Sequence, residues 1–408
     1  MTTKRAREMT LRIACVAIGL LLFGPAAVAA PPGVAELPAA DKLPAIAELP
    51  DPFLLKDGAR VKTREDWARR REELKAMILY YEYGHVPPPP GNVAATELSS
   101  SATGEEPAAT ERHLLLSIGC DKGKVEYRLD LTIPRGKQGP FPVILKGDLC
   151  WGKVPEKIRK EVVRRGYILA EFDRTQIAPD NNDRTKGVYP LYPDYDWRAE
   201  SAWAWGFHRT IDYLVTLKDV DAKRIAVTGH SRGGKAALLA GAFDERIALT
   251  CPNGSGAGGA GCYRVLGPKC EDLKAIVTSF PFWFHPRFKD FIDRVDRLPF
   301  DQHSLRALVA PRAQLSTEGL GDIWANPEGT QQTYVAAKEV YKFLGAAEKI
   351  GIHFRQGPHQ HNEEDFAALL DFADQQFFGK TVARKFDQLA FPDSPRRFSW
   401  SAPPTVHD

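Results

Sequence analysis

The sequence predicts an α/β fold, with a mostly parallel central sheet, antiparallel strands at its N-terminal edge and helices on both faces. Two patterns and one bulk property support this class. The first alternating apolar segments form a hairpin, and the later strand-like segments alternate with helix-like ones. The 408 residues are 43% hydrophobic and 10% aromatic, an ordinary globular composition that is ample for a large core.

Residues 1–29 are set apart from this fold. Basic side chains gather between residues 4 and 12, the apolar run 13–23 follows, and Ala27-Val28-Ala29 closes the segment. These are the three parts of a secretory signal peptide, and the apolar run is too short to span a bilayer comfortably. We therefore expect cleavage after Ala29, no membrane attachment, and a secreted or periplasmic protein. The alternative is an uncleaved membrane anchor.

The remainder is expected to form an extended arm, residues 30–60, and a single domain, residues 61–408. Spaced prolines mark the arm. The domain opens with a helix over residues 63–83, because apolar side chains recur there at helical spacing. Thr63 is its expected N-cap, and Gly84 stops it.

Strands and helices then follow in a regular order. Residues 113–119 and 124–133 alternate apolar and polar side chains around a turn at 121–123, which predicts an antiparallel hairpin. After the hairpin we expect strands at 141–146, 167–172, 224–228, 247–251, 313–317 and 350–354, and helices at 155–165, 200–217, 235–243, 330–344 and 365–378.

Charge and metal-ligand spacing exclude several function classes. The chain has 55 Lys and Arg against 52 Asp and Glu, and the excess of basic residues lies in the first 29 residues. A neutral mature chain without a basic stripe is not expected to bind nucleic acid or anionic membranes. No CxxC pair is present, and the pair His359-x-His361 lacks a convincing third ligand. We therefore expect no metal site.

A nucleophile motif stands between the strand at 224–228 and the helix at 235–243. Residues 229–235 read Gly-His-Ser-Arg-Gly-Gly-Lys and contain G-x-S-x-G. Such a tight strand-to-helix turn accepts only small residues two places before and after the serine, and it holds the hydroxyl at a helix N-terminus. The pattern predicts Ser231 as a nucleophile; the alternative is a plain turn serine.

The partners of this serine are expected later in the chain. In the α/β-hydrolase arrangement the order is serine, acid, histidine. His359 lies in the loop that leaves the last strand and is the predicted base, with His361 as the alternative. Asp322, in the Gly-rich loop after the strand at 313–317, is the predicted acid, and Glu318 is its rival.

An ester-cleaving site also needs hydrogen-bond donors for the oxyanion. The backbone N–H of Arg232, directly after the nucleophile, is the first predicted donor, and its guanidinium would add a charged one. The second is expected from the loop 147–151 that follows the strand at 141–146.

With Arg232 and Lys235 flanking the serine, the elbow resembles carbohydrate esterase family 15, the glucuronoyl esterases. The likeness extends over nearly the whole mature chain. Further matching motifs are LPDPF at 49–53, WARRR at 67–71, AWAWG at 202–206, GSGAGG at 254–259, FPFWF at 280–284, DIWANP at 322–327 and GPH at 357–359. The resemblance implies an α/β-hydrolase catalytic domain, a three-layer sandwich, over residues 61–408.

Members of this family cleave the ester between the 4-O-methylglucuronic acid of glucuronoxylan and lignin alcohols, without a metal or organic cofactor. The resemblance therefore implies an acyl-enzyme on Ser231 and a lignin–carbohydrate ester as substrate. It implies that Lys235 binds sugar hydroxyls and that Trp283 lines or stacks on the uronate, although a solvated lysine and a core aromatic are the plain alternatives. Glu271 falls near a polar sugar-binding position. A monomer is expected.

Two departures from the family pattern matter. Fungal-type members carry the acid in the Gly-rich segment where this chain has Gly254, so the acid is expected from the later loop, at Asp322, as in bacterial members. The cysteines that flank the fungal serine and base are replaced by His230 and Pro358. Any bridge would then join another pair, for example Cys262 with Cys270.

Two other functions compete with this reading. The same triad would serve an acetyl-xylan esterase or another carboxylic-ester hydrolase. A non-catalytic carbohydrate-binding protein could also keep the fold.

Overall fold

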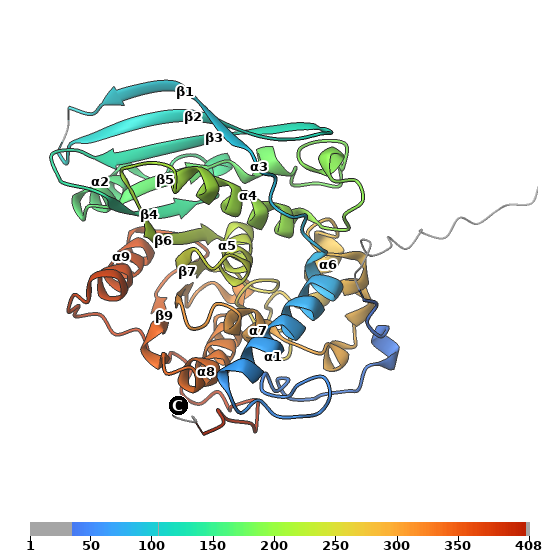
Figure 1. The fold of residues 1–408 in the computed structure, drawn as a ribbon. Helices are drawn as coiled ribbons and strands as arrows, with labels where there is room; N and C mark the ends of the chain where they lie inside the picture. Colours follow the sequence, from blue (N-terminus) through green and yellow to red (C-terminus); the bar gives the residue numbers. More distant parts are fainter. Residues whose placement is uncertain (1–34, 105, 405–408) are drawn as a thin grey trace, which may run out of the picture.

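A mixed sheet of nine strands forms the centre of the computed structural model, which describes residues 35–104 and 106–404 (Figure 1). The strand order is β1-β2-β3-β5-β4-β6-β7-β8-β9. Pairing is antiparallel from β1 to β5 and parallel from β5 to β9. The predicted α/β class with an antiparallel N-terminal edge is therefore confirmed. The signal peptide predicted at residues 1–29 lies outside the described residues.

Every strand predicted from the sequence is present, and one more precedes them. The strands are β1 Val93–Ala102, β2 Ala109–Cys120, β3 Gly123–Pro134, β4 Phe141–Lys146, β5 Ile168–Phe172, β6 Val220–His230, β7 Ile247–Asn253, β8 Ala313–Gly319 and β9 Ile350–Arg355. The sequence did not predict β1 because this edge strand is almost entirely exposed, so it lacks the apolar alternation of a half-buried strand.

Helices cover both faces of the sheet. They are α1 Arg64–Ile78, α2 Glu156–Arg164, α3 Arg174–Ile177, α4 Ala199–Leu214, α5 Arg232–Phe243, α6 Leu273–Ser279, α7 Gln302–Ala307, α8 Pro327–Phe343 and α9 Glu363–Phe378. Apolar side chains of α2 and α9 belong to one core layer, and those of α1, α4, α5, α7 and α8 belong to the other. Thr63 caps α1 through a capping box with Asp66, as its sequence predicted.

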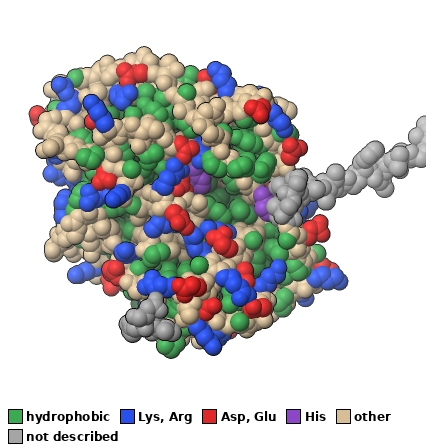
Figure 2. Space-filling view, in the orientation of Figure 1, with side chains coloured by type: hydrophobic (Ala, Val, Ile, Leu, Met, Phe, Trp, Pro, Cys, Tyr) green, Lys and Arg blue, Asp and Glu red, His purple; other side chains and the backbone are tan. Residues whose placement is uncertain are grey.

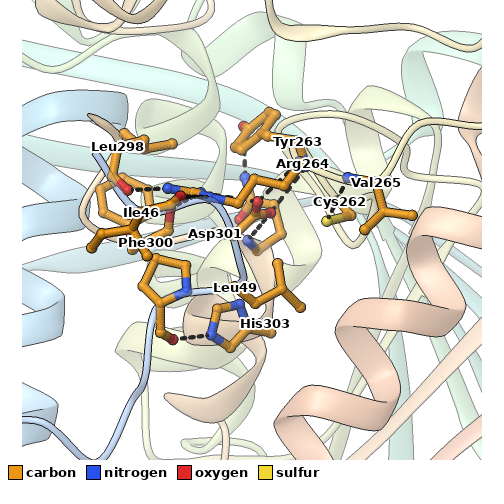
Figure 3. A network of polar contacts seen from close by, with 12 residues as sticks. Ile46, Leu49, Cys262, Tyr263, Arg264, Val265, Leu298, Phe300, Asp301 and His303 are labelled. Atoms are coloured by element: carbon orange, nitrogen blue, oxygen red, sulfur yellow. Dashed lines mark hydrogen bonds and ion pairs between the residues drawn. The ribbon is translucent and has the colours of Figure 1, made fainter. Parts of the chain in front are cut away.

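The N-terminal arm packs on the domain instead of standing away from it. Leu49 and Phe53 are fully buried. The His303 ring pairs with the Pro50 carbonyl at 2.8 Å. Arg264 donates to the Ile46 carbonyl at 3.2 Å, and Figure 3 shows these two residues side by side. Arg264 also pairs with Asp301 at 3.2 Å. The arm therefore braces the segment that follows the Gly-rich loop.

All five cysteines in the described part of the chain are free thiols. The bridge considered between Cys262 and Cys270 is not formed. Cys262 is buried, and its sulfur accepts a hydrogen bond from the Val265 amide at 3.3 Å (Figure 3). Cys270 is only half-buried. Burial raises the pKa of the Cys262 thiol well above its usual value.

Two surface properties bear on function. Basic and acidic side chains are interspersed on the face shown in Figure 2. Within residues 35–104 and 106–404, no helix combines the length and the apolar character that crossing a membrane requires.

Candidate active site

Ser231 occupies a strained turn between β6 and α5. Its φ of 54° is in the left-handed region, which residues other than glycine rarely adopt. Its amide donates to the Asn253 carbonyl at 2.9 Å, which ties the turn to the end of β7. A Cβ at Gly229 would overlap the Gly233 carbonyl, and a Cβ at Gly233 would overlap the Asp148 carboxylate. The two glycines are therefore needed for the serine to stand at the N-terminus of α5.

His359 and Asp322 form a hydrogen-bonded pair in the loops beyond the strands. The imidazole Nδ1 lies 2.5 Å from Asp322 Oδ2. The Asp322 side chain is 3% exposed and also accepts from the Ala325 amide at 3.3 Å, whereas the imidazole is 39% exposed. Because the carboxylate occupies Nδ1, the tautomer is set and Nε2 is left for proton transfer.

Arg355, the last residue of β9, holds the loop that carries His359. Its guanidinium donates to the carbonyls of Gln356 at 3.0 Å, Pro358 at 3.2 Å and Gln360 at 2.5 Å. Its Nε donates to the buried Asp365 at 2.8 Å. The loop is therefore fixed through its backbone, and the imidazole is presented by a rigid element.

The two alternatives to this pair have different surroundings. Glu318 is fully buried at the end of β8, and neither carboxylate oxygen has a hydrogen-bond partner among the described residues. Burial, with Asp322 nearby, raises the pKa of Glu318 well above its usual value. The His361 ring stacks on Phe366 with ring centroids 4.4 Å apart. The structure thus brings Asp322, and not Glu318, to the imidazole of His359.

Gly254 lies against this pair. A Cβ at this position would be 3.2 Å from Asp322 Oδ2 and 3.4 Å from His359 Nδ1. A longer side chain here would therefore compete for the same imidazole nitrogen. Because Gly254 has no side chain, His359 Nδ1 is free to pair with Asp322. This fits the departure from the fungal-type pattern, in which the acid stands at the position of Gly254.

Five side chains in and around the elbow form what we call the charged cluster: Lys235, Glu271, Arg232, Asp180 and Trp283. Lys235 Nζ donates to the Ser255 carbonyl at 2.5 Å and lies 3.6 Å from Glu271 Oε2, with both side chains about 95% buried. Arg232 pairs with Asp180 at 2.6 Å, and the other Asp180 oxygen accepts from the Trp283 indole at 2.8 Å. Asp180, which sequence reasoning missed, therefore orients both partners.

Trp283 does not fit the expectation that it stacks on a substrate ring. It is 2% exposed, its N–H is taken by Asp180, and its ring stacks on Phe280 with centroids 3.8 Å apart. An exposed indole on the Glu271 side of the cluster is that of Trp324, which is 53% exposed. Its carbonyl accepts from the Glu271 amide at 2.9 Å. The family-like motif at 322–327 contains Trp324, so the sequence offered both tryptophans as candidates. Only their burial shows which of the two can contact a ligand.

Asp148 supports the elbow from the loop after β4. It accepts from the His230 amide at 2.9 Å, from Lys146 at 2.5 Å and from Arg174 at 2.5 Å. Burial opposes its ionisation, but Lys146 and Arg174 outweigh this and hold the pKa of Asp148 at about 2. The carboxylate therefore stays charged and ties the loop expected to supply an oxyanion donor to the residue before Ser231.

Comparison with known proteins places this arrangement among enzymes. Residues 117–345 match the family model described as "Glucuronyl esterase, fungi". The chain is 34% identical over 352 residues to 4-O-methyl-glucuronoyl methylesterase 1 of Wolfiporia cocos, covering 83% of this chain and 81% of that protein.

Two solved structures are similar over most of their length. One is a carbohydrate esterase family 15 glucuronoyl esterase from Caldicellulosiruptor kristjansonii, with a TM-score of 0.76 and 33% identity over 89% of this chain and 99% of that one. The other is a serine-to-alanine mutant of the Sporotrichum thermophile glucuronoyl esterase in complex with methyl 4-O-methyl-β-D-glucopyranuronate. Its TM-score is 0.68 and its identity 28%, over 85% of this chain and 92% of that one.

Proposed function

Because the chain belongs to carbohydrate esterase family 15, the glucuronoyl esterases, we propose that it hydrolyses the ester between 4-O-methylglucuronic acid of glucuronoxylan and lignin alcohols. The observation that carries this function is the His359–Asp322 pair, formed in the loops beyond the strand ends where the Ser231 elbow also lies. The bound uronate ester in the Sporotrichum thermophile relative supports the sugar half of the substrate.

The proposed reaction proceeds through an acyl-enzyme. Ser231 Oγ attacks the ester carbonyl carbon while its proton passes to His359 Nε2. The bond from that carbon to the alcohol oxygen then breaks, and the same proton goes to the leaving oxygen. Water next attacks the acyl-enzyme, giving its proton to His359, and the glucuronate leaves as Ser231 recovers a proton. Asp322 stabilises the imidazolium in both halves.

Arg232 stabilises the oxyanion in this scheme. Its backbone N–H opens α5, where the helix dipole favours negative charge. Its guanidinium, held by Asp180 at 2.6 Å and 4.6 Å from the centre of the Trp283 ring, adds a fixed positive charge. In this scheme Asp180 holds the Arg232 guanidinium in place before the substrate binds.

The sugar is proposed to bind against Lys235 and Glu271, which supply hydrogen-bond donors and an acceptor for its hydroxyls. Trp324, and not Trp283, is proposed to stack on the sugar ring. The Trp324 indole is exposed, and its backbone carbonyl accepts a hydrogen bond from the Glu271 amide. No step of the scheme uses a metal or organic cofactor. We also propose that the mature protein is secreted or periplasmic, on the strength of the sequence of residues 1–29.

Release of glucuronate from methyl 4-O-methylglucuronate by the purified protein tests this function, with 4-nitrophenyl acetate in parallel and Ser231→Ala as the blank. We expect the uronate ester to be cleaved with the larger kcat/KM and the variant to be inactive on both esters. Cleavage of the acetate alone would support an acetyl esterase instead. Binding of the uronate without cleavage of either ester would support a carbohydrate-binding protein.

A further inference from the structure

A cavity of about 550 Å³ opens beside His359 and shares no lining residue with the charged cluster. It is bounded by the loop after β4 and by the first residues of α2 and α9. Rings form much of its wall, and they belong to Trp151, His230, His359, His361 and Phe366. We call it the ring-lined cavity. It is roomy enough for water, so solvent reaches the half-exposed imidazole of His359 from this side.

His230 is the part of this wall that lies against the predicted base. Its ring centroid is 4.3 Å from that of His359, and the two ring planes are inclined by 40°. Because His230 directly precedes Ser231, its backbone is fixed together with the elbow, and its amide donates to Asp148 at 2.9 Å. A second imidazole therefore stands at a set position beside the base and next to the nucleophile.

Hydrogen bonds at the end of β7 determine which nitrogen of His230 carries the proton. Nδ1 lies 2.6 Å from Asn253 Oδ1. Asn253 Nδ2 donates to Thr317 Oγ1 at 2.9 Å and to the Thr317 carbonyl at 3.3 Å, so the amide oxygen is the group that faces His230. An amide oxygen only accepts, and Nδ1 must therefore donate. This leaves a lone pair on Nε2.

The lone pair on His230 Nε2 is available to solvent. This nitrogen has no hydrogen-bond partner in residues 35–104 and 106–404, and it is not among their buried side-chain atoms. Burial, with His359 nearby, lowers the pKa of His230 to about 4, so the ring stays neutral near pH 7. His361 differs, because both of its ring nitrogens are buried. The accessible acceptor beside His359 Nε2 is therefore that of His230.

Hydrolysis of the acyl-enzyme needs a water molecule in a set orientation. This water donates one hydrogen to His359 Nε2, the base that removes its proton as the oxygen attacks the carbonyl carbon. Its second hydrogen needs another acceptor, because an unpaired O–H in a partly buried site is costly. With both hydrogens held, the lone pair that attacks has a fixed direction.

We propose that His230 Nε2 accepts the second hydrogen of the hydrolytic water, which makes His230 a further catalytic residue for deacylation. The water oxygen bonds to the acyl carbon, and its first proton passes to His359 Nε2 and then to Ser231 Oγ as the bond from that carbon to Oγ breaks. The second hydrogen stays on the oxygen and is lost to solvent when the released glucuronic acid ionises. This assignment rests on the proposed function, because it requires an acyl-enzyme on Ser231.

Competition between water and methanol tests the assignment. Methanol has a single O–H, which His359 takes, so attack by methanol on the acyl-enzyme does not use His230 Nε2. Benzyl 4-O-methylglucuronate is turned over with added methanol, and initial rates give the ratio of methyl 4-O-methylglucuronate to free 4-O-methylglucuronate. His230→Phe keeps a ring but has no acceptor. We expect it to raise this ratio about tenfold, the value of one lost hydrogen bond.

Two further variants separate this role from packing. His230→Leu also lacks the acceptor and should raise the ratio as His230→Phe does, although the two side chains pack differently. His361→Phe removes an imidazole of the same wall whose nitrogens are buried, so it is the matched control and should keep the native ratio. A purely structural role of His230 would slow attack by water and by methanol equally. An unchanged ratio in both His230 variants would therefore overturn the proposal.

Stopped-flow kinetics identifies the half-reaction that is affected. The 4-nitrophenyl ester of 4-O-methylglucuronate releases its coloured alcohol on acylation, so the burst and the steady rate report the two steps separately. We expect His230→Phe to keep the burst rate within about twofold and to lower the steady rate about tenfold. Equal losses in both phases would contradict a role in deacylation.

Failure of the proposed function would look different from failure of this assignment. If the native protein turns over no uronate ester, the proposed function itself is wrong. If it turns over the benzyl ester and the methanol-to-water ratio is the same in the native protein and both His230 variants, only the assignment of the water to His230 fails.

Discussion

The charged cluster and the ring-lined cavity both adjoin the Ser231 turn, but their side chains differ in kind. In the charged cluster Lys235 faces Glu271 and Arg232 faces Asp180, so ion pairs fix the geometry. In the cavity His230 and His361 are held neutral by burial and present ring faces. Because the two regions differ in this way, substitutions can be chosen that change one of them at a time.

The largest effect is expected at the imidazole that both regions share. Asp322→Asn should lower kcat about 10³- to 10⁴-fold on every ester, because the amide cannot stabilise the imidazolium or keep the tautomer. Steady-state kinetics on methyl 4-O-methylglucuronate measures this. Glu318→Gln is the matched control and should cost less than about tenfold, since the Glu318 carboxylate has no hydrogen-bond partner among the described residues. Equal losses in the two variants would argue against Asp322 as the acid.

A smaller effect, confined to the sugar side, is expected at Lys235. Lys235→Met should lower kcat/KM for uronate esters about 100-fold, the value of a lost charge-assisted hydrogen bond, and change 4-nitrophenyl acetate hydrolysis little. It also leaves the buried Glu271 unpaired, which costs about 3–5 kcal/mol of unfolding free energy. Adding Glu271→Gln should restore much of that stability in urea unfolding without restoring uronate activity. An equal loss on the acetate would show that Lys235 serves catalysis in general.

The two tryptophans on the sugar side are expected to respond differently. Trp324→Ala should lower kcat/KM for uronate esters about fivefold with little change in thermal stability, because its indole is exposed. Trp283→Phe loses the bond to Asp180 and should lower the unfolding free energy by about 1 kcal/mol. Kinetics and thermal melts on both variants check this. If Trp324→Ala kept the wild-type kcat/KM for uronate esters, Trp324 would not be the residue that stacks on the sugar.

The smallest effect on catalysis, and one specific to the ring-lined cavity, concerns acid stability. His230 has a pKa of about 4 in the folded protein and an ordinary value of 6.5. Between these values the unfolded chain binds a proton that the folded chain does not, so stability falls as the pH decreases through this window. From pH 7 to pH 5 this costs about 2 kcal/mol. Urea unfolding at both pH values should show a shallower pH dependence in His230→Phe; an identical slope would contradict the assignment.

A feature of the fold or the site could be predicted when the residues that determine it lie close together in the sequence. Strands β4 to β9 were predictable because their apolar runs are local, whereas the solvent-facing β1 has no such pattern. The elbow at Ser231 was predictable because its G-x-S-x-G pattern lies within five residues, and a Cβ at Gly229 would overlap the Gly233 carbonyl. Asp180 and Asp148 were not, because each joins segments 50 or more residues apart in ways that no spacing encodes.

Burial was the other quantity that the sequence could not supply. Trp283 and Trp324 both stand in family-like motifs, and only their exposure, 2% against 53%, separates a packed ring from one that can contact a ligand. In contrast, Gly254 was informative from the sequence alone. Its missing side chain pointed to an acid from another loop, and the structure places Asp322 against it.

The most direct test of the account is to trap the acyl-enzyme between the charged cluster and the ring-lined cavity. Rapid acid quench during turnover of benzyl 4-O-methylglucuronate, followed by digestion and mass spectrometry, should find a 4-O-methylglucuronoyl group on the peptide that contains Ser231. The adduct should be absent from Ser231→Ala. Turnover of the ester with the adduct on a different residue would contradict the account.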